Sequence, residues 1–397
     1  MIPELRKSQK ILAINFGGIG DEILFLPTLK KLRQLYPHSH ITLMLEPRSA
    51  SVRQITDVID AVVTFDIKKR PLFINDLVSV VSLIRDGGYE LVLSSGSSPL
   101  VSILLFLGGS DWRIGYDSGA LAQGFLTHAV PLKREQYAGN MYYDLAHYLE
   151  DTDVGQAAVC LPEITIAPEN MANMEDFLAS AHATADDAGK KRTDTEGKDA
   201  AGKDAGGTPA LPGGAAKKRI LLHPGTSRLA VEKGIIKTWA SANWVELIKL
   251  LQKQPDLEPI LAGGPDDQSI IAEINAGLPP NTTLLSSVGK TKSLADLAAL
   301  TKLCDLLVCV DSAPMHVAVG AGTPVVAMFV VTDEKKLLPT DAKFRAIRSG
   351  QDSGAGWAKS ERKSGRDAGV TEPTQPWPGV QLRPDDVYRA VLDQLRV

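Results

Sequence analysis

The chain has 397 residues, of which 44% are hydrophobic, and its formal net charge is −4. This length predicts two domains, and the hydrophobic fraction is sufficient for two buried cores. A nucleic-acid-binding protein would need a basic face, which this charge balance does not favour. No window reaches the roughly 20 apolar residues of a membrane-spanning helix. The charged N-terminus has no apolar signal segment behind it, so the sequence predicts a soluble, cytoplasmic protein.

The first part of the chain alternates short apolar runs with longer amphipathic segments. We predict strands at 11–16, 41–45, 62–65 and 91–94, and helices at 21–36 and 73–85. This alternation is typical of a parallel sheet covered by helices on both faces. It predicts a first Rossmann-like domain over residues 1–182.

Residues 183–217 consist mainly of Ala, Gly, Asp, Lys and Thr. Such a segment cannot bury enough apolar surface to offset its ordering entropy, so it is predicted to be a disordered linker.

A second alternating series follows this linker. Strands are predicted at 219–223, 258–262, 306–310 and 324–329, and helices at 242–252, 267–276 and 293–302. This series predicts a second Rossmann-like domain over 218–348. The polar stretch 349–380 is predicted to be a mobile loop, and 381–397 carries a last helix at 384–395. Ligands of open α/β sheets bind at the carboxyl ends of the strands, so we expect a cleft there.

A glycine-rich turn follows the first predicted strand and includes Gly17, Gly18 and Gly20. Glycines allow the backbone to approach a ligand closely. A dinucleotide fingerprint would need a third glycine where Ile23 stands, which disfavours a dehydrogenase. Asp21 opens the next helix, either as a partner of the helix dipole or as a general base at the ligand edge.

Two further strand ends could bind the phosphates or the nucleoside of a ligand. Thr226 and Ser227 follow one strand and can donate hydrogen bonds to phosphate oxygens, with Lys237 as a counter-charge. Gly263 and Gly264 follow another strand and would let a nucleoside approach the backbone. The alternative interpretation is that these segments are ordinary turns and that Lys237 is a solvated surface residue.

The stretch from Val308 to Gly320 is the most informative. A buried strand stops at Asp311-Ser312, and Pro314 fits the first turn of a new helix. The free N–H groups of such a helix start form a phosphate site, although Asp311-Ser312 could simply be an N-cap. Metalloprotease, zinc, hydrolase-elbow and P-loop motifs are absent from the sequence.

Three blocks in this order resemble glycosyltransferase family 9, the ADP-heptose:lipopolysaccharide heptosyltransferases and their relatives. They are Ile14 to Asp21; His223 to Ser227 with Lys237-x-Trp239 and Gly263-Gly264-Pro265; and Val310 to His316 with Pro324 to Phe329. The resemblance implies the α/β fold called GT-B, in which the parallel sheets of two Rossmann-like domains face each other across a cleft. It also implies inversion at the sugar, with no metal and no cofactor.

The resemblance also assigns roles to residues. Asp21 would be the general base, and Gly17, Gly18 and Gly20 would form the acceptor-side loop. Lys237 would be catalytic by stabilising the leaving diphosphate. The expected donor-binding residues are Thr226, Ser227, Lys237, Gly263, Gly264, Asp311, Ser312, Ala313 and His316. The last helix is expected to pack back on the first domain, as it does in related folds.

The expected partners are a nucleotide-sugar donor, ADP-heptose in this family, and a lipopolysaccharide core or related glycan acceptor. The sequence departs from the family pattern at Asn15, Ala313 and Val330-Val331, where the family commonly has a basic residue, Gly and Gly-Pro. The alternatives are a non-catalytic nucleotide-sugar-binding homologue and a GT-B nucleotide-sugar epimerase.

Basic residues of the first domain indicate peripheral contact with the inner membrane, or else ordinary solvated surface. They are Lys30, Lys31, Arg33, Arg48, Arg53 and the run at 68–70.

Overall fold

The computed structural model describes residues 9–67, 74–150, 159–181, 217–227, 237–280, 282–349 and 380–396. The predicted linker at 183–217 and the predicted mobile loop at 349–380 lie outside the described residues, apart from residues 217, 349 and 380.

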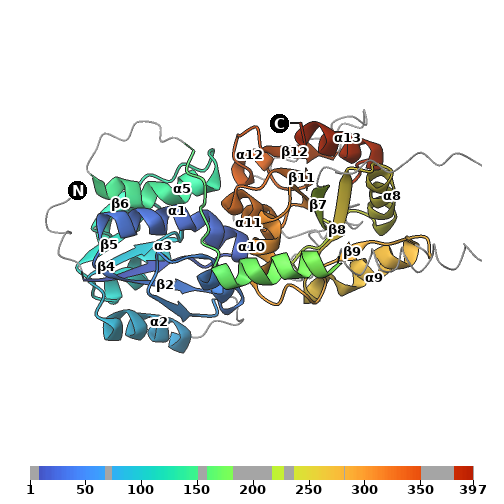
Figure 1. Cartoon of the computed structure of the whole chain (residues 1–397). Helices are drawn as coiled ribbons and strands as arrows, with labels where there is room; N and C mark the ends of the chain where they lie inside the picture. Colours follow the sequence, from blue (N-terminus) through green and yellow to red (C-terminus); the bar gives the residue numbers. More distant parts are fainter. Residues whose placement is uncertain are drawn as a thin grey trace, which may run out of the picture.

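The first domain is built on a six-stranded sheet in which every pair of neighbouring strands is parallel (Figure 1). Its strands, in the spatial order β3-β2-β1-β4-β5-β6, are β1 (Lys10–Ile14), β2 (His40–Leu45), β3 (Ala61–Thr64), β4 (Leu91–Ser94), β5 (Trp112–Tyr116) and β6 (His128–Val130). The connecting helices are α1 (Ile19–Leu35), the 3-10 helix η2 (Pro47–Ile55), α2 (Ile74–Gly87), α3 (Pro99–Leu107), α4 (Ala120–Phe125), α5 (Ala138–His147) and the 3-10 turn η3 (Tyr148–Glu150). The predicted parallel sheet is confirmed.

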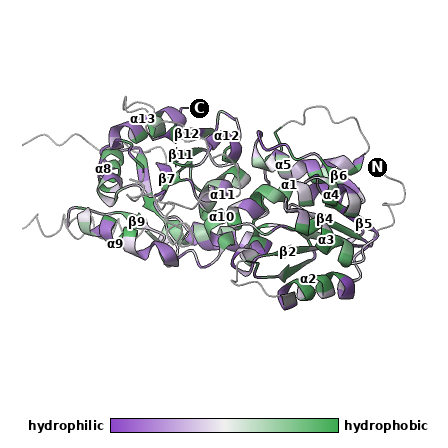
Figure 2. Ribbon diagram, turned by 180° about the vertical axis from the view of Figure 1, so that it is seen from behind, coloured by the Kyte–Doolittle hydropathy of each residue, from purple (hydrophilic) through white to green (hydrophobic). Residues whose placement is uncertain are grey.

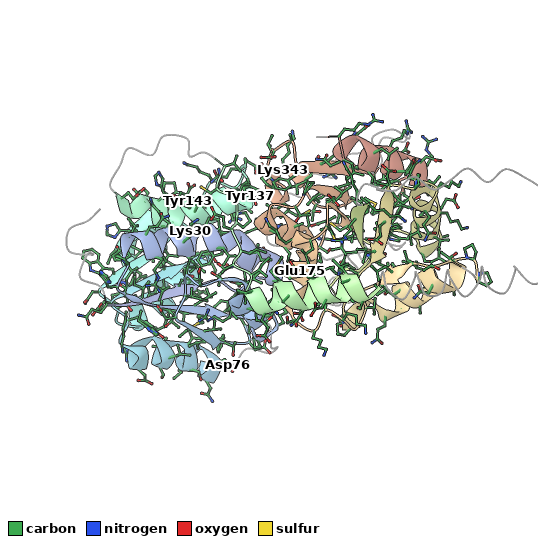
Figure 3. All side chains as sticks on the ribbon, viewed as in Figure 1. Lys30, Asp76, Tyr137, Tyr143, Glu175 and Lys343 are labelled. Carbon is green, nitrogen blue, oxygen red and sulfur yellow. The ribbon has the colours of Figure 1, made fainter. Side chains whose placement is uncertain are left out.

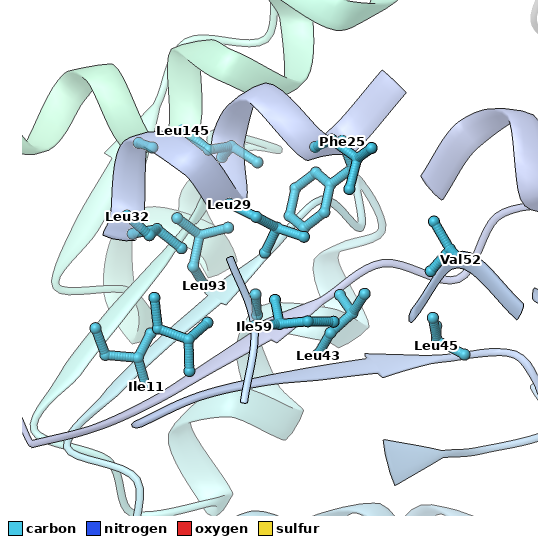
Figure 4. Close-up of a cluster of buried hydrophobic side chains, with 14 of the residues drawn as sticks. Ile11, Phe25, Leu29, Leu32, Leu43, Leu45, Val52, Ile59, Leu93 and Leu145 are labelled. Carbon is cyan, nitrogen blue, oxygen red and sulfur yellow. The ribbon is translucent and has the colours of Figure 1, made fainter. Parts of the chain in front are cut away.

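Helix α1 fixes the position of the first ligand-side loop. Its apolar face places Phe25, Leu29 and Leu32 over β1 and β2, where all three side chains are completely buried (Figure 4). Burying each of them contributes roughly 2 kcal/mol. The register of the central strands sets Ile11 of β1 beside Ile41 of β2 and Leu91 of β4. The helix therefore starts from the carboxyl end of a rigid central strand.

The second domain repeats this plan. Its parallel strands, in the order β12-β11-β10-β7-β8-β9, are β7 (Lys218–His223), β8 (Leu257–Leu261), β9 (Leu285–Ser286), β10 (Leu306–Val310), β11 (Val325–Phe329) and β12 (Phe344–Arg348). Its helices are α8 (Ser241–Gln252), the 3-10 turn η4 (Pro265–Asp267), α9 (Gln268–Gly277), α10 (Leu294–Lys302), α11 (Ala313–Ala321), α12 (Glu334–Leu337) and α13 (Pro384–Gln394). Strands β10 and β11 are buried throughout, as the apolar runs predict. Figure 2 shows the same distribution of hydropathy, with hydrophobic strands inside both domains and hydrophilic colour on the outer sides of helices such as α2.

The expectation that the last helix packs back on the first domain is wrong. Val387 and Val391 of α13 are completely buried in the core beneath the second sheet, and α13 lies against α8 (Figure 1). The chain enters this helix from Val380, which pairs with Trp239, while the indole N–H of Trp239 donates to the Leu382 carbonyl at 2.9 Å. These contacts anchor the start of α13 on the second domain.

The predicted boundary at residue 182 is also wrong. A helix covers residues 168–181, and its Met174 and Leu178 are buried in the core of the second domain. Figure 3 shows Glu175 on this helix, which runs beneath the second domain. The side-chain amide of Asn170 donates to Asp296 of α10 at 2.7 Å. The alternation of elements in the sequence does not reveal which sheet a connecting helix covers, and this one covers the second.

The two domains touch at several points. The Leu294 N–H of α10 donates to the side chain of Gln54 in η2 at 3.1 Å, and the Ile164 N–H donates to the Gly320 carbonyl of α11 at 3.2 Å. Within the described ranges, none of the helices combines the length and the apolar character required to cross a bilayer.

Candidate active site at the carboxyl edges of the two sheets

The loop before α1 wraps around Asp21. Gly18 is the N-cap of α1, and its N–H donates to Asp21 Oδ2 at 2.8 Å. A Cβ at Gly17 would lie 2.2 Å from Asp21 Cβ, so only glycine allows the loop to close over this side chain. Asp21 therefore satisfies the helix start, as its first-turn position predicts, and also stands at the ligand edge of the sheet.

The start of α1 meets α11 of the second domain. A Cβ on Gly20 would lie 2.6 Å from Cδ2 of His316, a distance that no ordinary Cβ contact reaches. His316 is buried between the two domains, and the nearby carboxylates of Asp21 and Asp311 act on it electrostatically. The structure therefore brings the predicted base and a predicted donor-binding residue into one site.

Asp311 and Lys237 form the centre of the part of the site that the second domain contributes. Asp311 follows β10 and is 4% exposed; its Oδ2 accepts a hydrogen bond from Lys237 Nζ at 2.6 Å and another from the Thr332 hydroxyl. A buried carboxylate needs such partners, because leaving it unpaired costs several kcal/mol. Residues 74 positions apart in the sequence thus form one ion pair at the sheet edge.

Burial keeps His316 neutral. Burial lowers its pKa, and the positive charge of Lys237 acts in the same direction, while Asp311 and Asp21 oppose the shift. A neutral imidazole offers one N–H donor and one acceptor nitrogen to a ligand.

Helix α11 begins without a side-chain cap. Ser312 is its N-cap, but the Ser312 hydroxyl donates backwards to the Val310 carbonyl at 3.1 Å, and in the described structure no side chain of the cap accepts from the helix. Ala313 and Pro314 form the first turn. Pro314 has no N–H, and the Met315 N–H donates to the Ser312 carbonyl at 3.0 Å, so this helix start offers an anion chiefly the positive end of the helix dipole.

The neighbouring strands bring the remaining predicted residues to this edge. Thr226 and Ser227 follow β7, which is paired with β10, and Gly263 and Gly264 follow β8 beyond it. Packing within the second domain also favours glycine at position 263, since a Cβ there would lie 2.4 Å from the side chain of Ile271.

Asp267 ties two of these loops together. Its Oδ2 accepts the Gly264 N–H at 2.8 Å and lies 3.8 Å from Nε2 of the buried His223. A Cβ on Gly225 would collide with the same carboxylate at 1.8 Å. The Gly225 loop is thus shaped to receive Asp267.

A model of one family, "Glycosyltransferase family 9 (heptosyltransferase)", matches residues 78–364. The chain belongs to glycosyltransferase family 9. It is therefore a glycosyltransferase, as the resemblance implied.

Relatives of known name support this membership. The chain is 24% identical over 324 residues to lipopolysaccharide heptosyltransferase 3 of Escherichia coli, covering 79% of this chain and 81% of that protein. A solved family 9 glycosyltransferase from Veillonella parvula aligns with a TM-score of 0.67 at 20% identity, covering 99% of this chain and 98% of that one. The E. coli ADP-heptose LPS heptosyltransferase II aligns with a TM-score of 0.65 at 18% identity, covering 98% of both chains. The predicted GT-B fold is confirmed.

Two features of this family 9 site were not predicted from the sequence. The ring of Tyr142 from α5 packs edge-on against Phe25 of α1, one helical turn from Asp21, and no motif around Tyr142 signals this. Arg348 of β12 donates to the Val330 carbonyl at 3.0 Å and pairs with Glu334. Arg348 thereby fixes the turn where Val330-Val331 replaces the family's usual Gly-Pro, so that Thr332 can reach Asp311.

Proposed function

We propose that this protein transfers a heptose from an ADP-heptose donor to a lipopolysaccharide core or related glycan, with inversion and without a metal ion. One observation carries the proposal: the carboxylate of Asp21 from the first domain and the Lys237–Asp311 pair from the second both lie next to the buried His316. A base and a cationic phosphate site thus meet from opposite domains. The relatives named above are a lipopolysaccharide heptosyltransferase and an ADP-heptose LPS heptosyltransferase, and they support this choice of substrates.

In the proposed reaction Asp21 removes the proton from an acceptor hydroxyl as its oxygen attacks C1 of the sugar. The bond between C1 and the diphosphate oxygen breaks on the opposite face, so a single displacement inverts the anomeric centre. The electron pair leaves with ADP. Lys237, the positive end of the α11 dipole, and the hydroxyls of Thr226 and Ser227 stabilise the charge on the departing diphosphate.

The ion pair prepares Lys237 for this role. Asp311 holds the ammonium group in place before the donor binds, with Nζ 2.6 Å from the carboxylate. Phosphate oxygens can then share the ammonium without a large rearrangement, because Lys237 keeps part of its exposure while Asp311 is buried.

Peripheral contact with the cytoplasmic face of the inner membrane fits a lipid-linked acceptor, but the charges of the described surface favour it less than the sequence indicates. Four of the basic residues of the first domain are ion-paired: Lys30 with Glu163, Lys31 with Glu150, Arg33 with Asp60, and Arg48 with Glu46. The basic run at 68–70 lies outside the described residues.

The test is transfer by the purified protein from ADP-heptose to heptose-deficient lipopolysaccharide, measured as ADP release with and without EDTA. Asp21→Asn should lower kcat by about 10²- to 10⁴-fold, the usual share of a general base, while ADP still binds. The wild-type protein is expected to be equally active with and without EDTA. Full turnover by Asp21→Asn would remove Asp21 from the base role. ADP binding without any transfer would instead favour the non-catalytic homologue.

A further inference from the structure

The carboxyl end of β2 brings an arginine to the proposed active site. Glu46 follows β2 as the N-cap of η2, and Arg48 lies in the first turn of that 3-10 helix. Two hydrogen bonds fix this turn: the Ser49 N–H donates to the Glu46 carbonyl at 2.9 Å, and the Ser49 hydroxyl donates to the Gly17 carbonyl at 3.0 Å. The backbone that carries Arg48 is therefore fastened to the glycine-rich loop that wraps around Asp21.

Glu46 holds the Arg48 guanidinium by one of its nitrogens. The Nε–H donates to Oε2 of Glu46 at 2.6 Å, and this carboxylate is 2% exposed whereas the Arg48 side chain is 38% exposed. Across the described ranges of the chain, the terminal nitrogens Nη1 and Nη2 of Arg48 make no hydrogen bond. A guanidinium has five N–H donors in a rigid planar fork. Arg48 is therefore oriented by a buried partner and keeps donors available for a ligand.

The terminal nitrogens of Arg48 lie near Asp21 at the ligand edge of the first sheet. A Cβ on Gly18 would lie 3.8 Å from Arg48 Nη2, 3.9 Å from Arg48 Nη1 and 3.7 Å from Asp21 Oδ2. Among the ion pairs of the described residues, Arg48 pairs with Glu46 and not with Asp21. The guanidinium and the proposed base thus border the same glycine, close enough for both to contact one sugar residue of an acceptor.

The charges at this point favour an acceptor that is itself anionic. An anionic group beside the Asp21 carboxylate would be repelled unless a cation compensates, and Arg48 places a cation there. We propose that Arg48 binds an anionic group of the acceptor, a carboxylate or a phosphate, next to the hydroxyl that Asp21 deprotonates. Two parallel N–H···O bonds from Nη1 and Nη2 would fix the orientation of the acceptor as well as its affinity. This inference rests on the proposed role of Asp21 as the base, and it makes Arg48 a determinant of acceptor specificity.

Arg48→Gln tests the proposal because it removes the cation and keeps a polar side chain. We expect KM for the acceptor to rise by about 10- to 100-fold, the effect of charged hydrogen bonds, with little change in KM for the donor. This variant leaves Glu46 buried without its cation, so Glu46→Gln/Arg48→Gln is measured beside it. The double variant should regain thermal stability but not acceptor affinity. A wild-type acceptor KM in the folded double variant would overturn the proposal.

Arg53→Gln is the matched control, because Arg53 lies on the same 3-10 helix and donates to the Thr56 carbonyl at 3.0 Å. Its acceptor KM should equal that of the wild type. Two modified acceptors identify the anion, one with its carboxyl groups reduced to alcohols and one with its phosphates removed. The modification that removes the ligand of Arg48 should raise the KM of the wild type and leave that of Arg48→Gln unchanged. If both proteins respond equally to both modifications, Arg48 contacts neither anion and the proposal is wrong.

A second readout does not depend on transfer. In protein labelled with ¹⁵N in arginine, the Nε–H signal of Arg48 is identified by its loss in Arg48→Gln. At least one of the anionic sugars glucuronate and glucose 6-phosphate should shift this signal saturably, and neutral glucose should not. Such a shift without any transfer from ADP-heptose would support the anion site while the proposed function fails. If neither anionic sugar moves the signal, Arg48 serves only as the partner of Glu46 and the proposal is refuted.

Discussion

Single residues at the domain contact explain why the glycines of the first loop differ in importance. Gly20 faces His316, and a Cβ there would be 2.6 Å from the imidazole carbon, whereas a Cβ on Gly18 would meet nothing closer than 3.7 Å. Both belong to the same glycine-rich turn, but only one of them lies against the other domain.

Gly20→Ala should therefore be destabilising, because α1 and α11 must move apart. We expect a loss of about 1–3 kcal/mol in the free energy of unfolding, measured by chemical denaturation. Gly18→Ala is the control and should lose less than about 1 kcal/mol, the difference between glycine and alanine at an N-cap. Equal losses in the two variants would show that the contact with His316 is not the cause.

Glu22 gives stability a dependence on pH. It is completely buried, and burial raises its pKa well above the ordinary value of 4.5, although the Gly17 N–H and the Asn15 amide favour the charged form. A carboxyl group whose pKa is raised by folding contributes stability that is fully present below pH 4.5 and is lost as the pH rises through its folded pKa. The side chain of Gln at this position is neutral at every pH, so its contribution to the free energy of unfolding does not change with pH.

The free energy of unfolding of Glu22→Gln, relative to the wild type, should thus increase from pH 4 to pH 8. Urea denaturation at several pH values measures this difference. A constant difference across this range would mean that Glu22 is ionised in the folded protein.

The Lys237–Asp311 pair couples stability to ligand binding. Lys237→Met leaves the buried Asp311 with only its Thr332 partner, which should cost up to about 3 kcal/mol of stability. It should also weaken ADP binding by roughly 10- to 100-fold, because a charged hydrogen bond to phosphate is lost.

The double variant Lys237→Met/Asp311→Asn separates these effects. It removes the uncompensated charge, so thermal unfolding should recover, while calorimetry should still show weak ADP binding. Recovery of both would argue against contact between Lys237 and the diphosphate.

Whole elements were predicted well where periodicity alone decides them. The helix beginning beside Asp21 and the strands ending at Leu45, Ser94 and Val310 lie within one or two residues of their predicted positions. Helix α13 was also predicted in its correct range, but on the wrong domain. Its amphipathic pattern does not specify which domain it covers, and in the structure its start is anchored by the pairing of Val380 with Trp239.

Val391→Ala tests the placement of α13. Val391 is completely buried beneath the second sheet, so the truncation should cost about 1–3 kcal/mol. Hydrogen exchange should show the loss of protection in α8, which packs on α13, and not in α1 or α5. Faster exchange confined to α1 and α5 would restore the original expectation that this helix belongs to the first domain.

At the scale of the whole molecule, the site exists because two separately built sheets meet at their carboxyl edges. Helix 168–181 follows the first domain in sequence but packs on the second, and Gln54 and Ile164 add hydrogen bonds between the domains. The proposed base and the proposed phosphate site come from strand ends almost 300 residues apart, at Asp21 and Asp311. Their proximity is a property of the domain contact and of neither domain alone.

Local sequence patterns are sufficient to predict the alternation of strands and helices, the two parallel sheets, the family, and the candidate residues Asp21, Lys237, Asp311 and His316. These follow from local patterns, because hydrophobic period and turn residues act over a few positions. Only tertiary packing brings Gly20 against His316 and the ring of Tyr142 against Phe25, and places α13 and helix 168–181 on the second sheet. Each of these depends on which of several apolar surfaces a helix covers, and residues distant in sequence supply that surface.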